Sequence, residues 1–171
     1  MLRTPLNFKR WIDEHRDLFK PPVGNKLVWE DADFIIMAVG SNTRRDFHVN
    51  EGEEFFYQVE GDIVLKVHED GKIVDIPIRE GEIFLLPSRV PHSPRRPENT
   101  VGLVIEKKRD EGEMDGFQWY CEQCGNKLHE EFAHITNIVT QLPPLLARFY
   151  GDESKRVCKK CGARFPDPKA K

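Results

Sequence analysis

Two histidines and a glutamate, His48, Glu54 and His92, are the residues of this sequence whose types and spacing could hold a catalytic metal. Five residues separate His48 from Glu54, and glycines at expected turns, Gly61 and Gly81, border the two segments that carry the three residues. Two neutral imidazoles and one carboxylate on one face of a metal leave the opposite positions open, which suits Fe(II) that binds substrate and oxygen together. We therefore predict an oxygen-using iron centre rather than three unrelated surface residues.

The carboxylate ligand has a rival, because Glu53 directly precedes Glu54. Side chains alternate along a strand, and the even spacing from His48 favours Glu54. A loop between these positions would break the alternation, so both glutamates stay candidates from spacing alone.

Two matched cysteine pairs, Cys121 with Cys124 and Cys158 with Cys161, form a second candidate metal site. A two-residue gap lets both thiolates of a pair face one ion, and the glycine after each pair permits a tight backbone turn. Four thiolates suit tetrahedral Zn(II) or a single iron, in preference to unpaired cysteines or a redox dithiol. Such a site has no open position, so we expect a structural or electron-carrying role.

The composition limits the classes of function. The chain has 171 residues and a formal net charge of −3, so we expect neither nucleic acid nor an anionic membrane as a partner. No apolar run approaches the roughly 18 residues that span a bilayer, and no apolar leader opens the sequence. We therefore expect a cytoplasmic protein, in which reduced thiols favour metal ligation over disulfides.

The elements that must position these residues are mainly strands. Alternating or branched apolar segments predict strands at residues 34–39, 54–59, 63–67, 73–78, 83–86 and 101–105. Short strands without intervening helices predict an antiparallel sandwich or barrel. A helix is predicted at residues 8–19, ended by two prolines, and another at residues 138–150, interrupted by Pro143 and Pro144.

The acidic and glycine-rich residues 110–116 resemble a linker. We therefore predict two parts: residues 1–110 as a barrel with an N-terminal helix, and residues 111–171 as a C-terminal region around the cysteines.

The segments that contain His48, Glu54 and His92 resemble the paired metal-binding motifs of the cupin superfamily. Many cupins carry another histidine two positions before the first one, where this sequence has Asp46. The departure favours a site with three ligands, in which Asp46 contacts the ligands rather than the metal.

Longer runs are similar to the 3-hydroxyanthranilate 3,4-dioxygenase family, and they lie at residues 7–8, 10–15, 20–25, 53–58, 83–87, 92–97 and 115–121. The resemblance covers nearly the whole chain, including a rubredoxin-like cysteine tail that would hold iron or zinc. It implies a cupin-type antiparallel β-barrel (jelly roll), a homodimer and Fe(II) in the barrel. It also implies conversion of 3-hydroxyanthranilate and O2 to 2-amino-3-carboxymuconate semialdehyde, on the kynurenine route to quinolinate and NAD.

The same resemblance implies that Arg44, Arg96 and Glu106 bind the substrate. An arginine fork suits a carboxylate, and a glutamate could accept from the substrate amine or hydroxyl. Arg45 and Arg95 are the neighbouring rivals for the two arginine positions.

Some roles stay open from the sequence. Asn25 could belong to a lid over the pocket, or could be a turn asparagine after glycine. The cysteine site could fold the C-terminal arm or hold metal in reserve. Other functions of a cupin are an oxygenase for another small acid and a non-enzymatic sensor, and the intact set of three ligands argues against the sensor.

Overall fold

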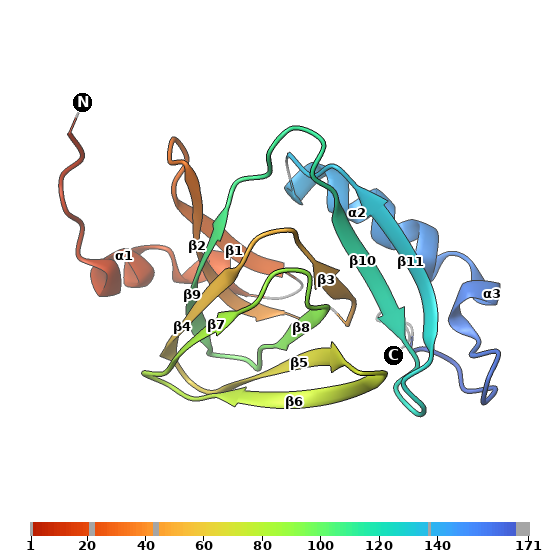
Figure 1. Cartoon of the computed structure of the whole chain (residues 1–171). Helices are drawn as coiled ribbons and strands as arrows, with labels where there is room; N and C mark the ends of the chain where they lie inside the picture. Colours follow the sequence, from red (N-terminus) through yellow and green to blue (C-terminus); the bar gives the residue numbers. More distant parts are fainter. Residues whose placement is uncertain (1, 21–22, 43–44, 137, 167–171) are drawn as a thin grey trace.

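The computed structural model describes residues 2–20, 23–42, 45–136 and 138–166, and its strands dominate the molecule (Figure 1). The strands are β1 Val23–Trp29, β2 Phe34–Asn42, β3 Phe47–Val49, β4 Glu54–Glu60, β5 Ile63–Glu69, β6 Lys72–Ile78, β7 Ile83–Leu86, β8 His92–Arg95, β9 Val101–Lys107, β10 Asp115–Tyr120 and β11 Lys127–Ala133. The helices are α1 Phe8–Glu14, the 3-10 helix η1 Arg16–Phe19, α2 Ile138–Tyr150 and α3 Glu153–Arg156.

Two antiparallel sheets form the body, ordered β1-β2-β9-β4-β7 and β11-β10-β3-β8-β5-β6. Side chains on alternate positions point to one face of a strand, and in β5 this places Ile63, Leu65 and Val67 in the core. They pack against Phe56 and Val104 of the other sheet. The predicted jelly-roll class is confirmed, as two facing sheets that no pairing between the described strands closes into one continuous barrel.

The predicted N-terminal helix is divided in the structure. Asn7 accepts a hydrogen bond from the backbone N–H of Arg10 and so caps α1, which ends at Glu14 before η1 begins. Phe19 of η1 lies so close to β2 that a Cβ at Gly40 would come within 2.3 Å of its carbonyl oxygen. A glycine is therefore required at this contact, which fastens the helical segment onto the five-stranded sheet.

The C-terminal part joins the six-stranded sheet directly. Asp115 begins β10, and the neighbouring Gly116 pairs with Val49 of β3. The predicted linker is therefore wrong at its last two residues, because they have backbone partners in the sheet. The division of the chain at residue 110 stays a prediction about folding units.

Helix α2 spans the predicted residues, but the prediction that prolines interrupt it was wrong. Pro143 and Pro144 lie inside the helix. Three buried side chains, Leu142, Leu145 and Phe149, pack on the aromatic residues of β10. Each such burial contributes about 1.5–3 kcal/mol, so the three together offset the roughly 3 kcal/mol that each of the two interior prolines costs a helix.

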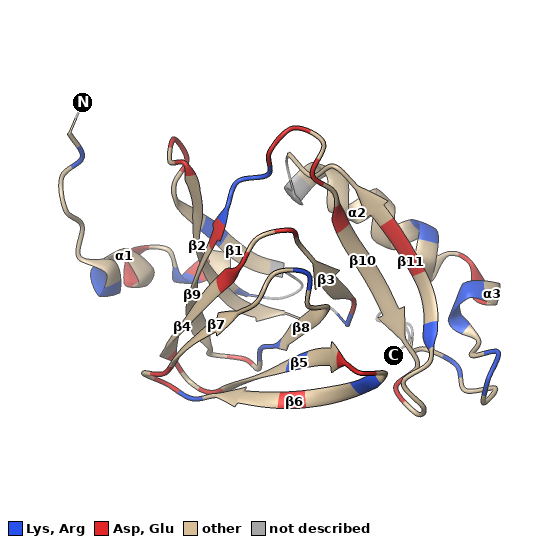
Figure 2. Ribbon diagram, viewed as in Figure 1, with Lys and Arg blue, Asp and Glu red and all other residues tan. Residues whose placement is uncertain are grey.

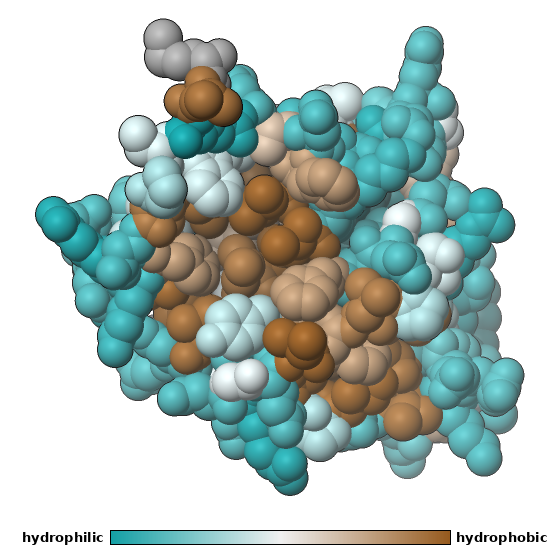
Figure 3. Space-filling view, turned by 60° about the vertical axis from the view of Figure 1, so that its left-hand side comes forward, coloured by the Kyte–Doolittle hydropathy of each residue, from teal (hydrophilic) through white to brown (hydrophobic). Residues whose placement is uncertain are grey.

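The outer face of the five-stranded sheet is apolar. Paired positions bring Ile36, Ile105, Phe55 and Leu85 into one row across β2, β9, β4 and β7. Leu85 is 53% exposed, and Ile83 beside it is 66% exposed. Figure 3 shows apolar residues gathered on this side of the molecule, while Figure 2 shows charges of both signs interspersed along the ribbon. Within the described residues, no helix has the length and apolar character needed to cross a membrane.

Candidate active site

The two sheets bring the three predicted metal ligands together. His48 on β3 and His92 on β8 are direct partners in the six-stranded sheet, and Glu54 begins β4 in the opposite sheet. One ligand atom from each residue lies within 4.8 Å of the others. Glu54 and His92 are buried, whereas the rival Glu53 is exposed. The site therefore lies between the sheets, and only Glu54 of the two glutamates faces it.

Hydrogen bonding fixes the orientation of the His92 ring. Its Nδ1 lies 3.0 Å from the carbonyl oxygen of Val90, and a carbonyl only accepts, so Nδ1 carries a proton. Nε2 then lies 3.0 Å from Oε2 of Glu54. A neutral ring would present a lone pair to a carboxylate there, so a cation has to be shared between them. A divalent metal ion fits this position between the two side chains, and a proton added to the His92 ring is the cation that can replace it.

The pKa values agree with this geometry. Burial alone would lower the pKa of His92, but the Glu54 carboxylate raises it above the ordinary value. Burial would likewise raise the pKa of Glu54, and His92, His48 and Arg109 together lower it. Each group therefore stabilises the charged form of the other, as expected where a cation is to be held.

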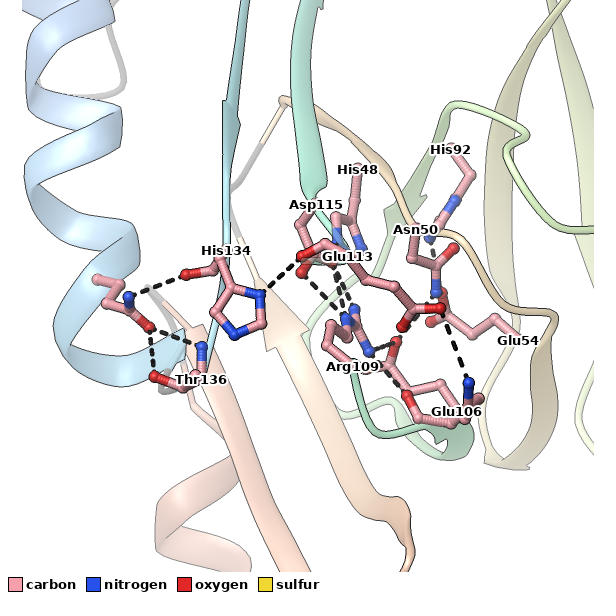
Figure 4. A network of polar contacts seen from close by, with 12 residues as sticks. His48, Asn50, Glu54, His92, Glu106, Arg109, Glu113, Asp115, His134 and Thr136 are labelled. Atoms are coloured by element: carbon pink, nitrogen blue, oxygen red, sulfur yellow. Dashed lines mark hydrogen bonds and ion pairs between the residues drawn. The ribbon is translucent and has the colours of Figure 1, made fainter. Parts of the chain in front are cut away.

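An ion-pair network not anticipated from the sequence surrounds these ligands (Figure 4). Nε2 of His48 lies 2.6 Å from Oδ1 of Asp115. Arg109 donates from Nη2 to the same oxygen at 2.6 Å and from Nη1 to Oε2 of Glu106 at 2.7 Å. Burial would raise the pKa of Asp115, but His48 and Arg109 lower it. The Arg109 guanidinium therefore links Asp115, the partner of the predicted metal ligand His48, to Glu106, the predicted substrate-binding glutamate.

Asn50 completes the link between the two glutamates of the site. Its Nδ2 donates to Oε2 of Glu106 at 3.0 Å and lies 3.4 Å from Oε2 of Glu54. Glu54 and Glu106 are register partners on β4 and β9. Burial and the Glu54 charge raise the pKa of Glu106, while Arg109 and His48 oppose the rise. Glu106 is thus placed to exchange a proton more readily than an exposed glutamate.

A pocket opens beside the three ligands. Its apolar wall and its polar residues come from both sheets, and the lining includes Met37, Val39, Phe56, Val104, Asn25, Asp46, Arg96 and Glu106. Asn25 lies in β1, so the turn alternative for it was wrong, and its role in a lid stays a prediction. Asp46 is buried at the pocket, just before β3. The predicted Arg44 lies outside the described residues.

Arg96 is the cation of the pocket among the described residues. It is 3% exposed, and Nη1 donates to Oε1 of Gln58 at 3.0 Å. Its Nε has no partner among the described residues. Burial lowers the pKa of Arg96 to about 10, so the side chain stays charged at neutral pH. Its rival Arg95 does not line the pocket, and Arg45 pairs with Glu122 on the surface.

The four cysteines form the second cluster. Sγ of Cys121 lies 3.5 Å from that of Cys161, and Sγ of Cys124 lies 3.7 Å from that of Cys158. A tetrahedral site with metal–sulfur bonds of about 2.3 Å needs sulfurs about 3.8 Å apart.

Each cysteine pair sits on the same kind of backbone turn. Gly125 and Gly162 have φ of 68° and 76°, and their N–H groups donate to the carbonyls of Cys121 and Cys158. The glycines are therefore needed for the left-handed conformation. The cluster fits a closed metal site.

Four residues of the site had no chemical signal in the sequence: Asn50, Gln58, Arg109 and Asp115. Arg109 belongs to a charged run that reads as surface, and Asp115 fell in the predicted linker. The run that begins at Asp115 and resembles the family was the available hint, but it gave no role to the residue.

The family profile and the sequence relatives of this chain agree with one another. The family profile described as 3-hydroxyanthranilic acid dioxygenase matches residues 1–150. A protein of Jannaschia sp. (strain CCS1) named 3-hydroxyanthranilate 3,4-dioxygenase is 56% identical over 165 residues, 95% of this chain and 92% of that protein. A protein of the same name from Xanthomonas euvesicatoria pv. vesicatoria is 53% identical over 169 residues, 98% of this chain and 96% of that protein. Among solved structures, a cupin-2 domain protein of Shewanella frigidimarina has a TM-score of 0.46 at 19% identity, covering 61% of this chain and 94% of that one.

Proposed function

The chain belongs to the 3-hydroxyanthranilic acid dioxygenase family, and from that premise we propose that it opens the ring of 3-hydroxyanthranilate with O2. The observation that carries the proposal is a single pocket that joins the His92–Glu54 pair to a buried, charged arginine. The first can hold a metal, and the second can hold the carboxylate of an aromatic acid.

His48, Glu54 and His92 would hold Fe(II), which supplies the redox chemistry of oxygen activation when bound. Two imidazole nitrogens and one carboxylate oxygen are a donor set that suits Fe(II) in oxygenases. The remaining tasks of binding, orientation and proton transfer belong to the side chains of this chain.

Arg96 binds the substrate carboxylate. Its guanidinium is buried and charged, and it has room for further acceptors, because Nε lacks a partner among the described residues. The apolar side chains of Phe56 and Val104 contact the ring and exclude water from it. Arg44 is proposed as a second arginine for the carboxylate, following the family resemblance.

Glu106 accepts the proton of the substrate hydroxyl or a hydrogen bond from its amine. Its raised pKa makes it a better base than an exposed glutamate, and Asn50 and Arg109 hold its carboxylate in place. Asp46 and Asn25, which line the same pocket, are proposed to support the ligands and cover the bound substrate.

The product is 2-amino-3-carboxymuconate semialdehyde, which contains both atoms of the O2 molecule. This reaction places the protein on the kynurenine route to quinolinate and NAD. The cysteine cluster holds Fe or Zn in a closed site, which folds the C-terminal arm or keeps metal in reserve. Four thiolate ligands need reducing conditions, in agreement with a cytoplasmic location.

The protein is proposed to be a homodimer that buries the apolar outer face of the five-stranded sheet. Leu85 and Ile83 are more than half exposed there, at 53% and 66%. A row of apolar residues across four strands is the kind of surface that a second copy covers in a symmetric pair.

An oxygen-electrode assay tests the reaction. Protein loaded anaerobically with Fe(II) is mixed with 3-hydroxyanthranilate and then with oxygenated buffer. We expect one O2 consumed per substrate, a new near-ultraviolet absorbance, and both atoms of 18O2 in the product. A protein that contains iron but consumes no oxygen would contradict the proposal.

A further inference from the structure

Two neighbouring strands build the pocket in three layers. The inward positions of β4 are Glu54, Phe56 and Gln58, and their register partners on β9 are Glu106, Val104 and Gly102. The first layer holds the carboxylates beside the histidines, and the second is the apolar wall. The third layer, Gln58 with Gly102, has no role in the proposed function, yet it contacts the buried end of Arg96.

Gln58 is fixed in one orientation. Its Nε2 donates to the carbonyl oxygen of Glu60 at 2.9 Å, across an irregularity in the pairing of β4 with β9. A carbonyl cannot donate, so the amide oxygen Oε1 is left to face Arg96. Gln58 is 1% exposed, so this amide cannot turn to solvent.

Gly102 provides the space for this contact. A Cβ at Gly102 would lie 2.7 Å from Nη1 of Arg96 and 2.8 Å from Oε1 of Gln58. Its φ is not in the left-handed region, so an alanine is acceptable to the backbone and would instead displace the two side-chain ends. The absence of a side chain at Gly102 therefore determines where the guanidinium lies.

Gln58, the hydrogen-bond partner of Arg96, is neutral and so does not offset the positive charge of the guanidinium. A carboxylate at position 58 would pair with the guanidinium and neutralise it before a ligand arrives. An amide orients the guanidinium with one hydrogen bond and leaves its positive charge for the pocket. No acidic side chain has a hydrogen bond to Arg96 among the described residues, and Glu54 is the carboxylate that influences its charge.

We propose that Gln58 and Gly102 are specificity-determining positioning residues. They hold Arg96 in place without giving it an acidic partner, so that the pocket selects aromatic ligands with a carboxylate. The proposal rests on the proposed function for the role of Arg96. It assigns no contact between Gln58 and the reacting atoms.

The test compares two ligands by calorimetry on anaerobic protein loaded with Fe(II). Anthranilate has the carboxylate and the amine, and 2-aminophenol has the amine and the hydroxyl but no carboxylate. In Gln58→Glu we expect anthranilate to bind on the order of 30-fold more weakly, the size of a lost interaction with a charged group. Binding of 2-aminophenol should stay within about threefold, because it does not use Arg96.

Two further variants separate charge from position. Gln58→Met removes the hydrogen bond without adding charge, and we expect about 10-fold weaker anthranilate binding. Gly102→Ala shifts the guanidinium, with a similar expected loss. Gln123→Glu and Gly52→Ala are the matched controls, because Gln123 is exposed and a Cβ at Gly52 meets only Lys107, at 3.6 Å. Both controls should bind the two ligands as the wild type does.

If the Gln58 and Gly102 variants bound anthranilate and 2-aminophenol more weakly by the same factor, the substitutions would have disturbed the structure, and this result would overturn the proposal. So would anthranilate binding by Gln58→Glu within threefold of wild type. Oxygen uptake by wild-type protein tests the reaction separately, because a wild type without turnover contradicts the proposed function while the binding ratio still decides the role of Gln58.

Discussion

Replacing Arg109 by methionine should destabilise the fold strongly. Its guanidinium is 10% exposed and pairs with Glu106 and Asp115, whose side chains are 6% and 1% exposed. The variant keeps a similar volume but leaves two buried carboxylates without their cation. Removal of one partner of a buried ion pair costs about 3–5 kcal/mol, so the thermal midpoint of a chain of this size should fall by roughly 6–20 °C.

Urea unfolding at pH 7 measures this loss, with two variants as references. Arg109→Lys keeps the charge but cannot bridge both carboxylates with a planar fork, so it should lose about 1–2 kcal/mol. Arg89→Met removes a pair with Glu51 whose arginine is 74% exposed, and it should lose less than about 1 kcal/mol.

The stabilisation that Arg109 provides should depend on pH. The pKa of Asp115 is lowered in the folded protein, so its contribution to stability is present above the unfolded pKa and is lost as the pH falls. The gap between wild type and Arg109→Met should therefore hold from pH 7 to about pH 4 and narrow at lower pH, where Asp115 becomes protonated. A loss below 1 kcal/mol at pH 7, or a gap that widens in acid, would refute the role given to Arg109.

Three other outcomes are expected. Replacing Cys124 and Cys158 by serine should lower the metal content, measured by elemental analysis, from two ions per chain to one, and an unchanged content would exclude ligation by the cysteines. Burial and the nearby Glu130 raise the pKa of Tyr120 to about 12, so an ultraviolet difference titration against Tyr120→Phe should show ionisation near that pH. Because the folded pKa is raised, the stability from Tyr120 is present below pH 10 and is lost as the pH rises through 12, and a titration near 10 would contradict its burial. Leu85→Lys should shift the protein from dimer to monomer in sedimentation, and a monomeric wild type would contradict the proposed interface.

Local patterns were enough for much of the fold. The aromatic, alternating and apolar patterns that predicted strands at residues 54–59, 63–67 and 83–86 are properties of a few adjacent residues, and β4, β5 and β7 lie there. Matched turns around the cysteines were also local, since each glycine acts on its own pair. Such features depend on the chain nearby and so could be predicted.

Features that depend on distant pairing could not be predicted. Asp115 read as part of a linker because its partner His48 reaches it only when β10 pairs with β3. Gln58 had no signal, because its contact with Arg96 requires both strands to be in their final register. The prolines of α2 were misjudged for a similar reason, since the apolar surface that stabilises the helix belongs to β10.

The central claim concerns three side chains around one ion, and anomalous X-ray diffraction at the iron edge tests it most directly. Crystals of the protein loaded with Fe(II) and soaked anaerobically with 3-hydroxyanthranilate should show an anomalous peak bonded to His48, Glu54 and His92, with the substrate beside it. Iron found only among the four cysteines, with none between the two sheets, would contradict the account.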